Sequence, residues 1–325
     1  MPLFVNTEDI HHYIPAVNVS ISASYLEKHM DRAAQNHIIP VTSRAMYAII
    51  VGDPTNYTEI LELIKTSAVA FACFQFANLN GIQLSDTGNL QIKTEGQTVA
   101  RKDDIEDFKI QVMDIAYRAL DDIAIYLEEN KDQTLTIGTG PAIPKYSAWK
   151  VSFQYSIFEN YFIKTADEFQ TYVNIRLSRR VFMHLKPAIN RVESLRLKPI
   201  LQIALLAALR TVQSDPIRDY LVQYIIKPAI ANLAFANGIN ELALIVDKYD
   251  STTQFDNQTR GHKQAAESQI KTTQSEREMD GTAFLNQILP YLYANQLSFP
   301  EYPFPPETTS SPQLIQEDDW RFYAN

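Results

Sequence analysis

Apolar residues recur at every third or fourth position over residues 99–130, which is the period of one face of an α-helix. The members of this pattern are Ile105, Phe108, Val112, Ile115, Ala119, Ile123 and Leu127. We therefore expect a long helix from about Val99 to Asn130.

Two segments that begin with Asp-Pro share a second pattern. "DPTNYTEILELIK" begins at Asp53 and "DPIRDYLVQYIIK" begins at Asp215, in the other half of the chain. Aspartate is a common helix cap, and proline fits the first turn of a helix. Both segments continue into a stretch that is apolar on nearly every side, which is typical of a buried helix. A Phe-Ala-Asn near a glycine, at Phe76 and Phe235, predicts where each helix ends, and Pro228 predicts a kink in the second.

The elements around these two helices also recur. Thr7 and Thr165 each precede acidic residues and predict the cap of a short helix, and Pro40 and Pro199 each begin a short apolar helix. Alternation around Asp86-Thr87-Gly88 predicts a β-hairpin, and residues 242–257 are its expected counterpart. The second closing helix has a polar first half, which predicts that it stands out from the body or packs on another subunit.

These recurrences predict a mainly α fold built by internal duplication. It has two tandem helical-bundle repeats, each with a long buried helix, a β-hairpin and a long last helix, and an extended C-terminal tail. The expected boundaries are residues 1–132 for the first repeat, 133–154 for a linker, 155–297 for the second repeat and 298–325 for the tail.

Composition narrows the class of protein. The 325 residues carry a net charge of −9 and are 46% hydrophobic, which allows a core and argues against non-specific nucleic-acid binding by the whole surface. One cysteine, Cys73, forms no internal disulfide and lies in an apolar run, so we expect a buried core residue. No signal peptide or membrane span is evident, and we expect a soluble cytoplasmic protein that does not contact a membrane.

Catalytic signatures are absent from the sequence, so we expect no enzyme activity and no cofactor. "GTGP" at Gly138 lacks the strand and helix of a phosphate loop. His11 and His12 are adjacent and point in different directions on a helix. Asp103, Asp104, Glu106 and Asp107 are compatible with a metal site, the basis of an enzyme alternative, but an acidic first helical turn explains them better.

Two segments have the character of partner-binding surfaces. The basic island, residues 176–198, contains one acid, Glu193, and seven basic residues: Arg176, Arg179, Arg180, Lys186, Arg191, Arg196 and Lys198. It suits an acidic partner or DNA phosphates, although a solvated helix pair also explains it. The tail ends in "EDDWRFYAN", and its aromatic residues Trp320, Phe322 and Tyr323 predict docking on a neighbouring subunit or partner.

The segments "FVNTEDIHHYI" and "TEGQTVARKDDIEDFKIQVMDIAYRALDDIAIYL", with the buried helix and hairpin between them, resemble the head–tail connector (adaptor) proteins of tailed bacteriophages. The chain is most similar to a connector-like group from phages and prophages of Bacteroidetes. Residues 1–132 match best and residues 155–296 match more loosely, with the polar last helix and Pro228 as departures. The tail lies outside the resemblance.

The resemblance implies a structural protein of the virion neck that forms a ring under the portal. Such a ring continues the DNA channel, binds tail or stopper proteins and lets DNA pass without sequence-specific binding. The family's rings have about twelve subunits, and a duplicated chain satisfies the same symmetry with half as many copies or with two layers. A helical scaffold unrelated to phage is the main alternative, and a metal-dependent enzyme is a third.

Overall fold

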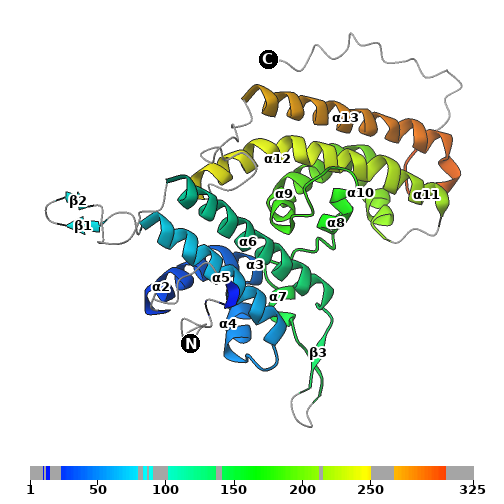
Figure 1. Ribbon diagram of the computed structural model, residues 1–325. Helices are drawn as coiled ribbons and strands as arrows, with labels where there is room; N and C mark the ends of the chain where they lie inside the picture. The colour runs from blue at the N-terminus through cyan, green and yellow to red at the C-terminus, as the bar shows by residue number, and fades with distance from the viewer. Residues whose placement is uncertain are drawn as a thin grey trace, which may run out of the picture.

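The computed structural model describes most of the chain. The described residues are 10, 12–14, 23–79, 83–85, 88–90, 102–136, 141–211, 215–249 and 267–304. The chain is mainly α-helical, and its helices form two successive units that lie side by side (Figure 1). We call helices α2 to α6 repeat 1 and helices α8 to α13 repeat 2. The expected fold class and the internal duplication are therefore confirmed.

Repeat 1 packs a long apolar helix between a helix pair and a long closing helix. Its elements are α2 (Ala23–Ala33), the π-helical turn η1 (Ala34–Ile38), α3 (Ile39–Thr42), α4 (Arg44–Gly52), α5 (Thr58–Leu79), β1 (Gln83–Ser85), β2 (Gly88–Leu90) and α6 (Lys102–Glu129). Helix α6 lies within the expected range of residues 99–130. Strands β1 and β2 pair antiparallel with Ser85 opposite Gly88, which confirms the hairpin predicted at that turn.

Repeat 2 has the same plan with a second core. Its elements are α8 (Ala166–Gln170), α9 (Arg179–Val192), η2 (Glu193–Leu197), α10 (Lys198–Leu209), α11 (Pro216–Tyr220), η3 (Leu221–Ile226), α12 (Lys227–Tyr249), α13 (Glu267–Ala294) and the 3₁₀ turn η4 (Gln296–Ser298). Thr165 caps α8 by accepting a hydrogen bond from the Glu168 amide, and Asp215 caps α11 in the same way through the Ile217 amide. The structure confirms both caps as the sequence predicts them.

The two units share one unusual backbone feature, a π-helical turn followed by a break in the helix. The π-helical turns η1 and η2 occupy corresponding places in the two repeats, and each ends two positions before a proline, Pro40 or Pro199. Just beyond each proline comes a break with positive φ, at Ser43 (φ 68°) and Gln202 (φ 60°). Proline lacks an amide hydrogen and clashes with the carbonyl one turn earlier, and a wider π turn removes that carbonyl from its path. The shared π-helical turn and the shared break are structural evidence of duplication, in addition to the recurring sequence patterns.

The segment between the repeats is partly structured. Strands β3 (Thr134–Leu135) and β4 (Ile143–Pro144) form a second hairpin, and α7 (Ser147–Lys150) follows it. Tyr146 and Trp149 are fully buried in the core of repeat 1, and the Trp149 indole donates a hydrogen bond to the Val41 carbonyl at 3.1 Å. The expected linker of residues 133–154 therefore contributes two aromatic residues to the first core.

Repeat 2 departs from prediction at its longest helix. Helix α12 continues past Phe235 to Tyr249, so the expected helix end is wrong, and residues 242–249 are helical rather than half of a hairpin. Gly238 lies inside the helix, and its role is to make room for a side chain of α9. A Cβ at this position would lie 2.5 Å from Cδ2 of Leu185. The glycine lets α9 and α12 cross closely.

Helix α13 packs along α12 and does not stand out from the body (Figure 1). Leu285, Ile288 and Leu292 from its second half are buried in the second core. In its polar first half, Arg277 donates to the Asn232 side chain of α12 at 3.1 Å. Among the described residues, no helix has the length and apolar character needed to cross a bilayer.

Candidate interaction surfaces

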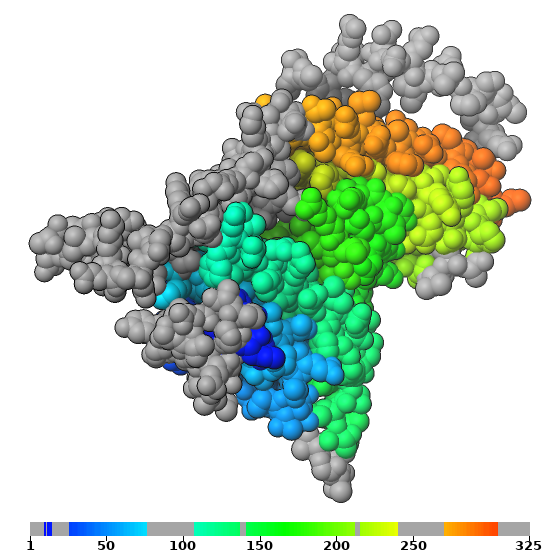
Figure 2. Space-filling view, viewed as in Figure 1, coloured from blue at the N-terminus to red at the C-terminus, as the bar shows by residue number. Residues whose placement is uncertain are grey.

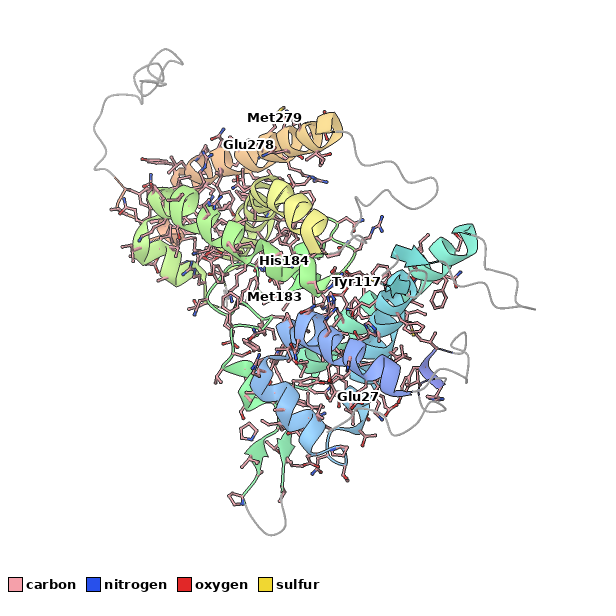
Figure 3. The ribbon with its side chains drawn as sticks, turned by 90° about the vertical axis from the view of Figure 1, so that its left-hand side faces the viewer. Glu27, Tyr117, Met183, His184, Glu278 and Met279 are labelled. Atoms are coloured by element: carbon pink, nitrogen blue, oxygen red, sulfur yellow. The ribbon has the colours of Figure 1, made fainter. Side chains whose placement is uncertain are left out.

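The two repeats meet where α6 passes the start of α9, and we call this contact the joint. Two lobes are visible there in Figure 2. The joint is formed by Tyr117, Asp121 and Glu128 of α6 with Ser178, Arg179 and Arg180 at the start of α9. In Figure 3, Tyr117 from repeat 1 lies near Met183 and His184 from repeat 2.

Arg179 forms a buried ion pair across the joint. Its Nε lies 3.3 Å from Glu128, and the two side chains are only 7% and 9% exposed. The same guanidinium lies 2.5 Å from Asp167 and donates to the Leu177 carbonyl, while Ser156 donates to the other Glu128 oxygen at 2.6 Å. Burial raises the pKa of Glu128, and the Ser156 hydrogen bond and the Arg179 charge oppose that rise. These contacts satisfy charges that would otherwise be costly to bury.

Asp121 of repeat 1 caps a helix of repeat 2. Its Oδ1 accepts hydrogen bonds from the amides of Arg179 (2.9 Å) and Arg180 (3.4 Å), the first two residues of α9. The Ser178 hydroxyl donates to the same oxygen at 3.3 Å. A carboxylate at a helix N-terminus satisfies free amides and interacts favourably with the helix dipole. Helix α9 is therefore positioned by a side chain from the other repeat.

Arg180 covers an aromatic cluster on the repeat 1 side. Its guanidinium carbon lies 3.8 Å from the centroid of the Tyr117 ring, which packs nearly perpendicular to the ring of Phe71. His37 of η1 stacks on the other side of this cluster, with its ring 3.9 Å from that of Phe71. Burial, and then the Arg180 charge, lowers the pKa of His37 to about 4, and burial lowers the pKa of Arg180 to about 10 against the attraction of Asp121. The histidine is thus neutral in the folded protein at neutral pH.

The joint corrects one part of the expected basic island. Arg179 is buried and Arg180 is held over Tyr117, so neither is available to an external partner. The sequence contained a signal for this, because Arg179 lies one helical turn before Phe182 on the face that α9 buries. The other residues proposed for partner binding, Arg176, Arg191, Arg196 and Lys198, are exposed, and Arg196 lies 4.0 Å from Glu278 of α13.

Helices α6 and α13 have stripes at corresponding positions, and the two stripes differ in sequence and in exposure. The α6 stripe is Tyr117, Asp121, Ala124 and Glu128, and the same spacing on the second closing helix gives the α13 stripe, Thr282, Asn286, Leu289 and Tyr293. In the α6 stripe Tyr117, Ala124 and Glu128 are 9%, 3% and 9% exposed, because repeat 2 lies over it. In the α13 stripe Leu289 and Tyr293 are 40% and 46% exposed, and Thr282 and Asn286 are exposed as well. Repeat 1 uses its α6 stripe to bind repeat 2, whereas the corresponding α13 stripe of repeat 2 is exposed to solvent.

An open groove of about 530 Å³ borders the α13 stripe. It is lined by Tyr220, Ile225, Asn286, Gln287, Pro290 and Tyr291. The rings of Tyr220 and Tyr291 stack with centroids 5.4 Å apart, which fixes one wall. Sequence reasoning missed this groove, because its two sides come from segments far apart in the chain, Tyr220–Ile225 and Asn286–Tyr291.

The remaining candidates from the sequence do not form a site in the described part of the chain. Cys73 is buried, and burial raises the pKa of its thiol to about 12. The described residues contain no cluster of three or more His, Cys, Asp or Glu side chains suited to a metal ion. His12 and Asp107 are exposed, and α6 begins at Lys102, which places the acidic cluster in its first turns. His11, Gly138, Trp320, Phe322 and Tyr323 lie outside the described residues.

Comparison with known proteins gives one match. A family of unknown function (DUF6712) matches residues 25–158 and 198–312, one segment in each half of the chain. No curated protein and no solved structure matches. The two matched segments agree with the duplication seen in the backbone, and together they cover most of the sequence. The chain therefore belongs to this family, DUF6712.

Proposed function

We propose that the protein is a structural component of the neck of a tailed bacteriophage. In this proposal, copies of the chain form a head–tail connector ring that docks on the portal protein, continues the DNA channel and gives tail or stopper proteins a docking surface. The protein does no chemistry, and its exposed faces serve assembly. The bacteriophage part of the proposal depends on the sequence resemblance, and the assembly part depends on the packing of the two repeats.

The open α13 stripe is the observation that carries the assembly proposal. Repeat 1 binds repeat 2 through the α6 stripe, and the two surfaces in contact are different, so the packing is head-to-tail. Repeat 2 has a stripe at the corresponding positions of α13, and this stripe is exposed. A head-to-tail contact whose α13 side is open can continue from one chain to the next, and it yields a ring when the rotation closes.

The substitutions along the α13 stripe suit contact with another copy. Asn286 takes the place of Asp121 and keeps an oxygen that can accept a hydrogen bond from a helix N-terminus. Leu289 and Tyr293 take the places of Ala124 and Glu128, which makes the surface more apolar. Exposed apolar and aromatic residues are enriched at subunit contacts.

Charge is compatible with a DNA channel. The chain has a net charge of −9, and a lumen of that sign repels the phosphate backbone and favours passage without adhesion. The exposed basic residues Arg176 and Arg196 then suit a protein neighbour with an acidic surface. We expect about twelve copies, or half that number if each duplicated chain fills two positions.

The assembly proposal is tested by the double substitution Asn286→Arg and Leu289→Glu on the α13 stripe. Wild-type protein is expected to form defined oligomers by light scattering and electron microscopy, while this variant has the mass of one chain, 37.1 kDa. Val151→Glu is the matched control, because Val151 is 87% exposed and lies outside the stripe. A wild-type protein that stays monomeric at all concentrations, or a variant that assembles normally, contradicts this part.

The bacteriophage part needs its own experiment. The protein is mixed with the portal protein encoded in the same genome, and the mixture is imaged. Rings stacked coaxially on the portal are the expected result. Oligomers that never bind the portal would instead favour the non-viral scaffold.

A further inference from the structure

The C-terminal tail contains a sequence counterpart of a residue that completes the core of repeat 1. The chain has two tryptophans, and each is followed by a basic residue, as Trp149-Lys150 and Trp320-Arg321. Trp149 follows the "YLEEN" that ends at Asn130, and Trp320 follows the "YLYAN" that ends at Asn295. Each tryptophan therefore lies a short, comparable stretch beyond the closing helix of its repeat.

Trp149 docks at the backbone break that follows η1. It is fully buried, its indole donates to the Val41 carbonyl at 3.1 Å, and its ring packs nearly perpendicular to that of Tyr155. The helix is interrupted at Ser43, just beyond Val41, and this interruption makes a helical carbonyl available to an outside donor. Ser43 itself is only 5% exposed.

Repeat 2 has the same break without the same cover among its described residues. Ile200 corresponds to Val41 and Gln202 to Ser43, with φ of 60° at Gln202 and 68° at Ser43. Gln202, unlike Ser43, is exposed. Beside it, Ile203 is 68% exposed and Leu195 is 66% exposed. We call Arg191, Leu195, Lys198 and Ile203 the η2–α10 face.

Two positions of the η2–α10 face are apolar, while the corresponding positions of repeat 1 are polar. Leu195 and Ile203 correspond to Asn36 and Arg44, which are exposed polar residues of repeat 1. Large apolar side chains on a helix surface favour a covering partner. Arg191 and Lys198 add positive charge at the margin, and both are exposed.

We propose that residues 317–323 of the same chain cover the η2–α10 face, with the Trp320 indole donating to the Ile200 carbonyl as Trp149 does to that of Val41. Charge supports this occupant, because Glu317, Asp318 and Asp319 directly precede Trp320 and are opposite in sign to Arg191 and Lys198. Chain length is compatible with this occupant, because Phe304 packs against the same core as Leu201 of α10, and the chain from Phe304 to Trp320 spans up to about 50 Å when extended.

This inference is independent of the bacteriophage assignment and of assembly through the α13 stripe. It assigns the tail the same role in repeat 2 that α7 has in repeat 1. The tail is then part of the fold of its own chain.

The test uses full-length protein labelled with 5-fluorotryptophan, in which the two tryptophans give two ¹⁹F resonances. Trp320→Phe assigns them. Both resonances are expected at positions shifted from free fluorotryptophan and protected from a solvent isotope shift. The double variant Arg191→Glu and Lys198→Glu should move the Trp320 resonance to the free position and leave that of Trp149 in place, which also verifies folding.

Two further variants make the test specific. Arg32→Glu, at the repeat 1 position that corresponds to Arg191, should change neither resonance. Adding Asp318→Lys and Asp319→Lys to the double variant should restore the Trp320 shift through exchanged charges. A Trp320 resonance at the free position in wild-type protein, or one unmoved by the charge reversal, overturns the proposal. A shift that disappears on dilution overturns docking within one chain and assigns the tail to a neighbouring copy.

Discussion

Helices α6 and α13 each have 28 residues and close their repeats in the same way, yet their outer faces have different surroundings. The inner face of each packs on a long apolar helix. The outer face of α6 is also covered, and it holds a helix cap and a buried ion pair for the other repeat. The outer face of α13 is exposed. The comparison teaches that contact with the other repeat, rather than helix length or position within the repeat, decides which polar residues of a closing helix become buried.

The largest expected effect comes from breaking the joint on the α6 side. Arg179→Ala leaves Glu128 buried without its cationic partner, and we expect a loss of about 3–5 kcal/mol in the free energy of unfolding. Urea titration followed by circular dichroism measures it. Replacing Glu128 and Arg179 together with Met should recover most of the loss, since it leaves no uncompensated charge.

Arg176→Ala provides the control for the joint, because Arg176 is exposed and lies close to Arg179 in the chain. It should change the free energy of unfolding by less than about 0.5 kcal/mol. Equal effects of the two arginine substitutions would show that the ion pair does not stabilise the joint.

A second prediction concerns pH and His37. The pKa of His37 is about 4 in the folded protein and 6.5 as a reference, so the unfolded chain binds a proton first as pH falls. The stabilisation from neutral His37 is complete above pH 6.5 and is lost as pH falls toward 4. Relative to His37→Gln, wild type should lose about 3 kcal/mol between pH 7 and pH 4. Parallel stability curves for the two proteins would contradict the burial of His37 against Phe71.

A third prediction concerns the close packing of the inner face of α13 on α12. A Cβ added at Gly281 would lie 2.5 Å from Cγ of Leu233 and 3.1 Å from its backbone nitrogen, so Gly281→Ala must push α12 and α13 apart. We expect a loss of about 1–3 kcal/mol by thermal or urea unfolding. Gly52→Ala is the control, because nothing lies within 4 Å of a Cβ there, and it should be neutral or stabilising. A stabilising Gly281→Ala would show that the helices are less closely packed.

The smallest effect is expected on the part of α6 that faces solvent. Arg118 lies 2.5 Å from Asp114 one turn earlier, but the two side chains are 76% and 54% exposed. Arg118→Ala should cost no more than about 0.5 kcal/mol, and less at high salt. A cost similar to that of Arg179→Ala would mean that the outer face of α6 is covered over a wider area than the joint.

Local patterns predicted local structure well. The helical period of apolar positions predicted α6, the Asp-Thr-Gly turn predicted the β1–β2 hairpin, and Thr165 and Asp215 predicted helix caps. Each of these features depends on neighbours close in the chain, so the sequence contains the complete signal. The duplication was visible for the same reason.

Features decided by contact between distant segments were not predicted. Gly238 resembles a helix end in sequence, but its role is set by Leu185 on a different helix. Asp121 and Glu128 resemble a solvated helix face, and only the packing of repeat 2 shows that they are covered. The basic island wrongly included Arg179 as a surface residue, because a charged residue is rarely buried and its burial requires a carboxylate that comes from the other repeat.

The π-helical turns make the two repeats sensitive to deletions of a single residue. Such a turn is equivalent to one extra residue inserted in an α-helix. Deleting one residue from η2 would turn α10 by about 100° relative to α9, because each residue of an α-helix advances by that angle. Leu201 and Leu205, now fully buried, would rotate out of the core. The length of this turn therefore decides whether the apolar side chains that follow it in the helix face the core or the solvent.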